Sequence, residues 1–346
     1  MTDELLSTLP VIAAPMAGGP STPALVAEVG RAGGLGFLAA GYLTAEALGR
    51  QLVELEDMSE SAYGVNLFLS SPDSADPAAI DAYADRLAPV AAELGVELGT
   101  RAWTDDALEA KIAVLAGHRP AYISLTFAAP SSELVAQLRR DTGARVIATV
   151  TSVDEARQAV ASGVDLLCAQ GMEAGGHRGI FQDDSSQPDG GQMVPVRDLI
   201  RQITAVTGTP VIAAGGLSTG ADIAAVLATG AVAAQLGTAF LCTPEAGTSR
   251  THRRALLDRE GTRTVITRAF SGRPARALEN AFVIEHSAEA PSGYPQIHHL
   301  TRPLRVAAAA QGRGDLLHLW AGTGWQHVTE ETAFTLVRRL AAEAGL

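Results

Sequence analysis

The chain contains a single lysine, Lys111, and only two cysteines, Cys168 and Cys242. An enzyme that forms a Schiff base needs an amine at its reacting centre. The one lysine lies in DALEAKIAVLAGH (106–118), whose spacing is that of an amphipathic helix. The cysteines stand singly in apolar surroundings, which indicates small buried residues. Schiff-base chemistry, a disulfide framework and a thiolate metal site are therefore all disfavoured.

Positive charge and long hydrophobic runs are also scarce. The formal net charge is −12, and the arginines are scattered, whereas a nucleic-acid partner requires a concentrated basic face. The apolar runs are short and broken by glycine, so none predicts a membrane span. The acidic opening MTDELLSTLP lacks the basic and apolar regions of a signal peptide. We expect a cytoplasmic protein without nucleic-acid or membrane partners, and leave assembly into a homo-oligomer open.

What the chain does have is a regular alternation of short apolar runs with alanine-rich segments of helical spacing. Continuous apolar strands that alternate with helices predict a parallel sheet with a covered outer face. Eight such runs occur, at residues 10–17, 35–40, 63–69, 121–127, 145–151, 166–171, 210–216 and 231–240.

Eight strands over this length predict an α/β fold of the (β/α)8 TIM-barrel type. A doubly wound sheet would place a glycine-rich turn after its first strand, but GRAGGLG (30–36) comes before the second. A long insertion follows the third strand, and a tail follows the eighth. We expect a barrel over 1–240 and a mostly helical cap over 241–346 that packs on the barrel mouth. The polar, acidic segment 172–191 is typical of a mobile lid.

Active sites of this fold lie at the carboxyl ends of the strands. Seven of the eight predicted strand ends carry neither a carboxylate nor a histidine. Metal-dependent barrels and glycosidases need several such groups there, so no metal site is expected. The sixth end, QGMEAGGHRG (170–179), carries His177. The ends otherwise offer glycines, hydroxyls and the amides of Asn66 and Gln170, a surface that suits a bound cofactor.

The last two strand ends, AAGGLSTGADI (213–223) and QLGTAF (235–240), indicate what the cofactor carries. Glycines directly after the strands, with Ser218 or Thr219 as a helix N-cap, predict a phosphate site made of backbone amides and a helix dipole. A phosphate-bearing cofactor without lysine or metal points to flavin mononucleotide (FMN). Asn66 and Gln170 would then supply donors and acceptors to the edge of the flavin ring.

With these residues in place, the sequence resembles the nitronate monooxygenase family over most of its length. The resemblance rests on 14–42, on NLF (66–68), GMEAGGHRG (171–179), 211–231, QLGTAFL (235–241) and LWAGTGW (319–325). It implies an FMN-dependent oxidoreductase that oxidises alkyl nitronates with O₂ to a carbonyl compound and nitrite. The family's catalytic histidine falls on His177, as a base or as a hydrogen-bond partner of the nitro group. The implied flavin contacts are Met16, Asn66, Gln170, Gly175, Gly216, Gln235, Leu236, Gly237 and Thr238.

Where some members carry a histidine in the fourth strand, this chain has Thr126. The pre-formed nitronate, rather than the neutral nitroalkane, is therefore the expected substrate. Two other functions remain open at this stage. One is an FMN-dependent NAD(P)H enoyl-thioester reductase, since such enzymes also carry an EAGGH loop; the other is a non-catalytic flavin-binding protein.

Several charged and aromatic residues receive weaker predictions. Glu173 either orients His177 or caps the loop, and we expect the structural role. Arg178 either holds an anionic substrate or pairs with Asp183 or Asp184, and we expect the pairing. In the tail, Tyr294 is a candidate for the substrate pocket, and Trp320 and Trp325 either cover the flavin or anchor the tail. The remaining histidines of the tail are expected at the surface or in packing, namely His298, His299, His318 and His327.

Overall fold

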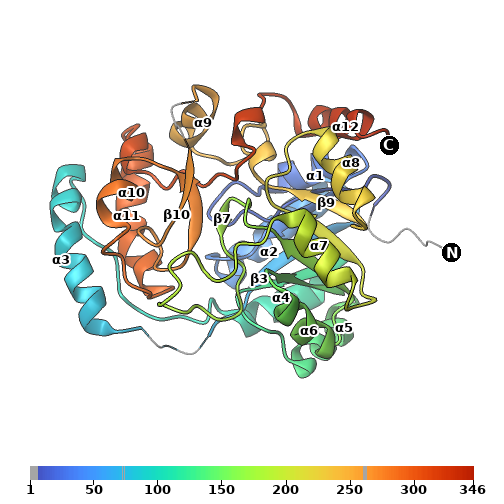
Figure 1. Cartoon of the computed structure of the whole chain (residues 1–346), viewed down its shortest axis with the longest axis horizontal. Coiled ribbons are helices and arrows are strands. Elements are labelled where there is room, and N and C mark those ends of the chain that lie inside the picture. Colours follow the sequence, from blue (N-terminus) through green and yellow to red (C-terminus); the bar gives the residue numbers. More distant parts are fainter. Residues whose placement is uncertain (1–6, 72, 74, 260–262) are drawn as a thin grey trace.

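A closed barrel of eight parallel strands forms the body of the molecule in this computed structural model, which describes residues 7–71, 73, 75–259 and 263–346 (Figure 1). All eight predicted strands are present, so the TIM-barrel prediction is confirmed. In barrel order they are β1 (Val11–Ala13), β2 (Leu35–Ala39), β3 (Tyr63–Phe68), β4 (Tyr122–Thr126), β5 (Arg145–Val150), β6 (Leu166–Gln170), β8 (Val211–Ala214) and β9 (Ala233–Leu236). Pairing of β9 with β1 closes the barrel.

Helices cover the outer face of the barrel, as the alternating pattern predicts. Their apolar stripes pack on the strands, while the inward-facing strand residues fill the barrel with a second set of side chains that includes Ile12, Phe37 and Ile212. Thr22, Thr44, Ser131 and Ser152 cap helix N-termini by accepting backbone N–H groups. The barrel helices are α1 (Pro23–Arg31), α2 (Ala45–Met58), α4 (Leu108–His118), α5 (Ser132–Thr142), α6 (Val153–Ala161), α7 (Val196–Thr204) and α8 (Gly220–Ala228).

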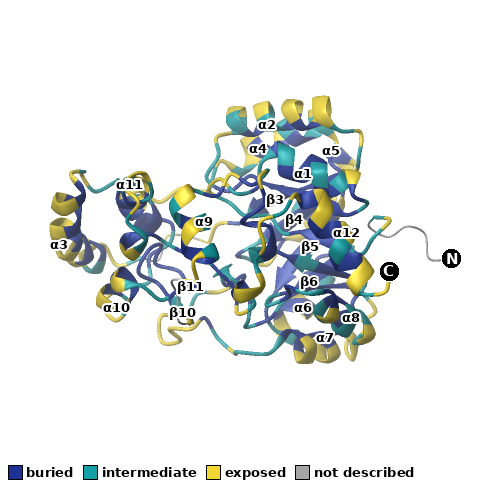
Figure 2. Cartoon of the chain, turned by 90° about the horizontal axis from the view of Figure 1, so that it is seen from above, coloured by how far each residue is buried: buried dark blue, intermediate teal, exposed yellow. Residues whose placement is uncertain are grey.

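A second lobe stands beside the barrel and has its own hydrophobic core (Figure 2). It combines the insertion after β3 with most of the tail, because α3 (Pro77–Leu94) packs against α11 (Gln296–Ala310). The Tyr83 hydroxyl of α3 donates to the Ala269 carbonyl at 2.7 Å, which fixes the insertion to the tail. The lobe also contains α9 (Arg250–Leu257) and α10 (Ala281–His286).

The lobe contains a small antiparallel sheet that the sequence patterns did not predict. Strand β10 (Thr264–Thr267) pairs with β11 (Ala275–Leu278), and β11 pairs with β7 (Gly176–His177) from the loop after β6. Since β7 carries His177, this sheet fixes the loop of the sixth strand end to the lobe. The last helix, α12 (Ala333–Glu343), leaves the lobe and packs against α1 and α8 of the barrel. The division at residue 240 stays a prediction.

The segment 172–191, which the sequence suggests as a mobile lid, is hydrogen-bonded to arginines of the lobe. Arg268 forms a two-pronged ion pair with Asp183, with both N···O distances 2.7 Å. Arg273 donates to the carbonyls of Arg178 and Ile180, and Arg276 donates to that of Met172. In this structure the segment therefore lies closed between barrel and lobe.

Both cysteines are buried and free, as predicted. Across the described part of the chain, no helix has both the length and the apolarity needed to cross a membrane.

Candidate active site

A cavity of about 610 Å³ lies at the carboxyl ends of the barrel strands, between barrel and lobe. This volume is typical of a site for a cofactor or small molecule. All ten residues predicted for the site contribute to its lining, which brings together segments from the first strand end to the last. They are Met16, Asn66, Gln170, Gly175, His177, Gly216, Gln235, Leu236, Gly237 and Thr238.

His177 lies on β7 with its ring among aromatic side chains. The rings of Phe127 and Tyr294 are both 5.8 Å from it, and that of Trp320 is 5.4 Å away. Its Nε2 atom lies 2.9 Å from the Ser271 hydroxyl, whereas Nδ1 has no hydrogen-bond partner among the described residues. Burial, with Arg273 and Arg305 nearby, lowers the pKa of His177 to about 3. The imidazole is therefore uncharged at neutral pH and has one ring nitrogen free for a ligand.

The Asn66 amide is oriented by the barrel. Its Nδ2 atom donates to the Ser124 carbonyl at 3.2 Å, to the Ser124 hydroxyl at 2.9 Å and to the Thr126 hydroxyl at 3.0 Å. Because a carbonyl oxygen can only accept, this contact assigns the nitrogen to the barrel side. The Oδ1 atom, which has no partner among the described residues, is the group that Asn66 can offer to a ligand as an acceptor.

Gln170 differs from what its position in the sequence suggests, because its amide is already engaged with the loop that follows it. Its Nε2 atom donates to the His177 carbonyl at 3.0 Å, and its Oε1 atom accepts from Gly179 N–H at 2.8 Å. Gln170 lines the cavity, but its two side-chain hydrogen bonds hold the backbone of the loop that carries His177.

The predicted phosphate turns offer free donors. Gly215 and Gly216 have φ values of 116° and 70°, a backbone region that favours glycine. After β9, the short 3₁₀ helix η1 (Thr238–Phe240) begins at the cavity. No hydrogen bond within the described chain engages the amides of Gly216, Leu217, Gly237, Thr238 and Ala239. These N–H groups form a concave donor set of the kind that binds phosphate.

The N–H groups at the start of α8, which the sequence predicts as phosphate donors, are mostly engaged within the chain. Thr219 is the N-cap, as predicted, and it forms a capping box with Asp222. The Asp222 carboxylate accepts the N–H groups of Ser218 and Thr219 at 3.0 and 2.9 Å. The Gly220 amide donates to Glu343 of α12 at 3.1 Å. The amides of Ser218, Thr219 and Gly220 at the start of α8 are therefore occupied, which leaves the phosphate role mainly to the glycine turn and η1.

The LWAGTGW segment (319–325) closes one side of the cavity. Thr238 accepts from Gly322 N–H at 3.0 Å, which joins the segment to the last barrel strand. The two tryptophans are predicted either to cover the flavin or to anchor the tail. Trp325 anchors the tail, because it is buried in the core of the lobe. Trp320 lines the cavity next to His177.

Glu173 and Arg178 are both structural. The Glu173 carboxylate accepts from Val196 N–H at 3.1 Å and so caps α7, in line with the prediction. The expected pairing of Arg178 with Asp183 or Asp184 is wrong. Asp183 pairs with Arg268, and the buried Arg178 donates to the carbonyls of Gly171 and Gln192.

The sequence reasoning missed a group of residues that the lobe brings to the site. His177 is the only histidine at a strand end, yet His252, His298 and His318 also line the cavity. The His298 ring stacks on that of Tyr42 at 3.7 Å, and the Tyr294 hydroxyl donates to the Tyr42 hydroxyl at 3.1 Å. Arg302 and Arg305 line the same cavity. These two arginines, close to His298 in the sequence, were the one feature that could have pointed to this part of the tail.

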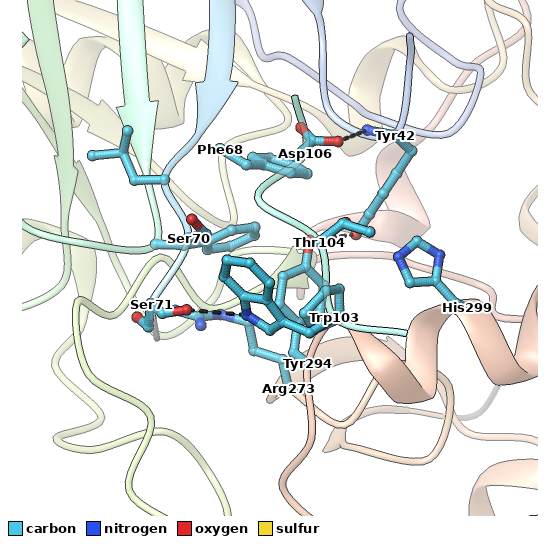
Figure 3. A pocket seen from close by; sticks show the side chains of 13 residues that line it. Tyr42, Phe68, Ser70, Ser71, Trp103, Thr104, Asp106, Arg273, Tyr294 and His299 are labelled. Carbon is cyan, nitrogen blue, oxygen red and sulfur yellow. Dashed lines mark hydrogen bonds between the residues drawn. The ribbon is translucent and has the colours of Figure 1, made fainter. Parts of the chain in front are cut away.

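A smaller cavity of about 50 Å³ adjoins the first and shares Tyr42, Phe68 and Phe127 with it. Figure 3 shows that Trp103 and Thr104, from the segment between α3 and α4, face Tyr294 and Arg273 of the lobe across it. The Trp103 indole donates to the Ser71 carbonyl at 3.2 Å. Tyr294, predicted as a pocket residue, lines this cavity and also contacts His177.

No group of three or more His, Cys, Asp or Glu side chains arranged to hold a metal ion occurs among the described residues. With the site's geometry in view, the chain can be compared with known proteins. The sequence model of the nitronate monooxygenase family matches residues 1–343. The chain belongs to the nitronate monooxygenase family. Family membership thus makes the chain an oxidoreductase.

Two curated members of the family show how far the similarity extends. The nitronate monooxygenase of Pseudomonas aeruginosa is 38% identical over 99% of this chain and 99% of its own length. That of Paraburkholderia phytofirmans is 38% identical over 96% of this chain and 92% of its own.

Among solved structures, a nitroalkane oxidase from Streptomyces ansochromogenes matches with a TM-score of 0.94 and 45% identity, over 98% of this chain and 97% of that one. FabK from Thermotoga maritima matches with a TM-score of 0.76 at 24% identity, over 98% and 93% of the two chains, which shows a shared fold alone.

Proposed function

We propose that this chain is an FMN-dependent nitronate monooxygenase that converts alkyl nitronates and O₂ to a carbonyl compound and nitrite, in the cytoplasm. The observation that carries the proposal is the meeting of an uncharged His177 with the free amides of two glycine turns in one cavity. Family membership supplies the class of substrate.

The donor set fits FMN. Amides that are free at the glycine turn and at η1 would hold the phosphate, and the cavity volume of about 610 Å³ can admit a flavin. Met16, Asn66, Gln235 and Gly237 would contact the ring system. When bound, FMN supplies the capacity to accept electrons from the substrate and to deliver them to O₂.

The protein's own contribution is made by His177 and the groups that hold it. Ser271 fixes the ring through Nε2, so Nδ1 is the atom that meets the substrate. With the hydrogen on Nε2, the Nδ1 lone pair accepts a proton from the substrate carbon. With the hydrogen on Nδ1, it donates a hydrogen bond to a nitro oxygen. The second role requires the Ser271 hydroxyl to donate to Nε2 instead of to the Arg273 carbonyl, which lies 3.2 Å away. The lowered pKa of His177 makes it a weak base, which supports that role and a pre-formed nitronate.

Anaerobic bleaching of the flavin tests the proposal. The purified protein should be yellow, release FMN on denaturation, and lose its flavin absorbance when mixed with an alkyl nitronate. Bleaching by NAD(P)H but not by nitronates would instead identify an enoyl-thioester reductase. A colourless protein that FMN cannot reconstitute would overturn every flavin-based function.

A further inference from the structure

Arg305, on α11, is a buried cation in the cavity wall without a carboxylate partner. It is 8% exposed and lines the cavity. Its Nε atom donates to Thr301 Oγ1 at 3.2 Å, and Nη2 donates to the His298 carbonyl at 2.8 Å. Nη1 has no hydrogen-bond partner within the described chain. The guanidinium is thus held at one end and left open at the other.

The neighbours of Arg305 do not neutralise it. His177, His298 and His318 lie within reach of its charge, and all three have a lowered pKa because they are buried, so they are uncharged at neutral pH. The hydroxyls of Tyr42 and Tyr294 also stay protonated, because burial raises the pKa of each. Arg302, at the rim of the same cavity, adds positive charge.

The fold accommodates its other buried arginines in two ways. Arg268, 7% exposed, has Asp183 at 2.7 Å. A buried charge without such a partner is costly, and truncation of a partner usually destabilises a protein strongly. Arg178 and Arg273 are also buried, and they donate to backbone carbonyls instead of a carboxylate. Arg305 differs from both because it lines the large cavity, where its unpaired Nη1 can meet a ligand.

We propose that Arg305 selects substrates in their anionic form, by binding a planar two-oxygen anion such as a nitronate in preference to the neutral nitroalkane. A guanidinium presents donors in a plane that match two oxygens sharing one negative charge. A chain of contacts places Arg305 near the proposed catalytic residue. Arg305 Nη2 contacts the His298 ring, and that ring packs against the rings of Tyr42 and Tyr294. The Tyr294 ring in turn lies 5.8 Å from that of His177. The inference rests on the proposed function and assigns its substrate selectivity to one residue.

A binding experiment on the flavin-loaded protein tests the anion site without turnover. The probes are butyrate, which has the shape and charge of an alkyl nitronate, and butyramide, its neutral analogue, both titrated by calorimetry. Arg305→Met should weaken butyrate about 10- to 100-fold, the range for loss of a hydrogen bond to a charged group, and leave butyramide unchanged. Arg305→Lys should recover part of the affinity, because it restores the charge without the fork.

The matched control is Arg313→Met, which removes the same charge from an exposed arginine of the lobe paired with Asp315 and Glu93. It should leave butyrate binding at the wild-type value. In turnover, Arg305→Met should lower the ratio of kcat/KM for a nitronate to that for its nitroalkane about tenfold or more.

Two results would overturn the inference: no measurable binding of butyrate by the wild-type protein, or equal loss of butyrate and butyramide in both Arg305 variants. Failure of the wild-type enzyme to react with any nitronate would instead refute the proposed function, and the butyrate titrations would still decide whether Arg305 binds anions.

Discussion

The Nε2 atom of His177 and the Oγ atom of Ser271 are 2.9 Å apart, although 94 positions separate these residues in the chain. Ser271 is almost completely buried, and its hydroxyl also lies 3.2 Å from the Arg273 carbonyl. The serine therefore holds one ring nitrogen of the histidine and leaves the other to the cavity. This relationship joins the barrel's sixth strand end to the lobe at the reacting centre.

Removal of either partner should reduce turnover, to different extents. His177→Ala should lower kcat for nitronates about 100-fold, at the lower end for loss of a proton-transfer or hydrogen-bonding group. Ser271→Ala removes one hydrogen bond worth about 1 kcal/mol, so kcat should fall about fivefold while flavin content stays normal. Stopped-flow measurement of flavin reduction separates this step from O₂ consumption. Full turnover in His177→Ala would show that the histidine has no catalytic role.

Acid should destabilise the fold through its buried histidines. The pKa is lowered to about 3 for His177 and about 4 for His252, and well below 6.5 for His298 and His318. Below pH 6.5 the unfolded chain binds protons that these folded-state imidazoles do not. The free energy of unfolding should therefore be highest above pH 6.5 and fall towards pH 4, by up to about 1.4 kcal/mol per pH unit for each histidine.

Urea titrations at pH 4.5, 5.5, 6.5 and 7.5 would measure this dependence. Replacement of His252 by Gln should reduce the slope, because its buried imidazole is one of those whose pKa is lowered. A free energy of unfolding that stays constant from pH 6.5 to pH 4.5 would contradict the assignment of uncharged, buried imidazoles.

Flavin retention should depend on Gly216. Its φ of 70° disfavours any side chain, and an added Cβ would lie 2.6 Å from the Glu173 Cβ. Gly216→Ala should therefore distort the turn that offers the free amides, and the purified variant should hold much less flavin per chain. Gly208→Ala is the matched control, because a Cβ there meets open space. The ratio of visible to 280 nm absorbance measures the outcome; equal ratios in both variants would argue against a phosphate site at this turn.

The single lysine should be important for stability rather than for chemistry. Lys111 is 1% exposed, and its Nζ lies 2.6 Å from Asp106 Oδ2, while Asp106 Oδ1 accepts from Tyr42 N–H at 3.0 Å. Lys111→Met leaves that carboxylate without its cation and should cost about 3 kcal/mol of unfolding free energy. The double variant with Asp106→Asn should regain part of the loss in denaturant titrations. A double variant less stable than Lys111→Met alone would contradict this account.

The barrel could be predicted from the local pattern of the sequence alone. Each strand is a short apolar run between helical segments, and burial on both faces makes such runs visible without any knowledge of their partners. The same register placed Met16, Asn66, Gln170, His177 and the glycine turns at one end of the barrel, where the structure finds them lining one cavity.

The sequence by itself thus determined the barrel and the line of residues along its mouth, because these depend on spacing along the chain, and its motifs indicated the family by resemblance. Only the tertiary structure decided how those residues are used. The Gln170 amide bonds to the loop that follows it, and Asp222 accepts the Thr219 amide just before α8. Glu343 accepts the Gly220 amide, and Arg305 reaches the cavity from a lobe about 130 residues beyond His177. The Gly220–Glu343 contact and the position of Arg305 join distant segments, and no local pattern encodes them. The bonds of Gln170 and Asp222 are local, but their effect on the site appears only when the strand ends are assembled.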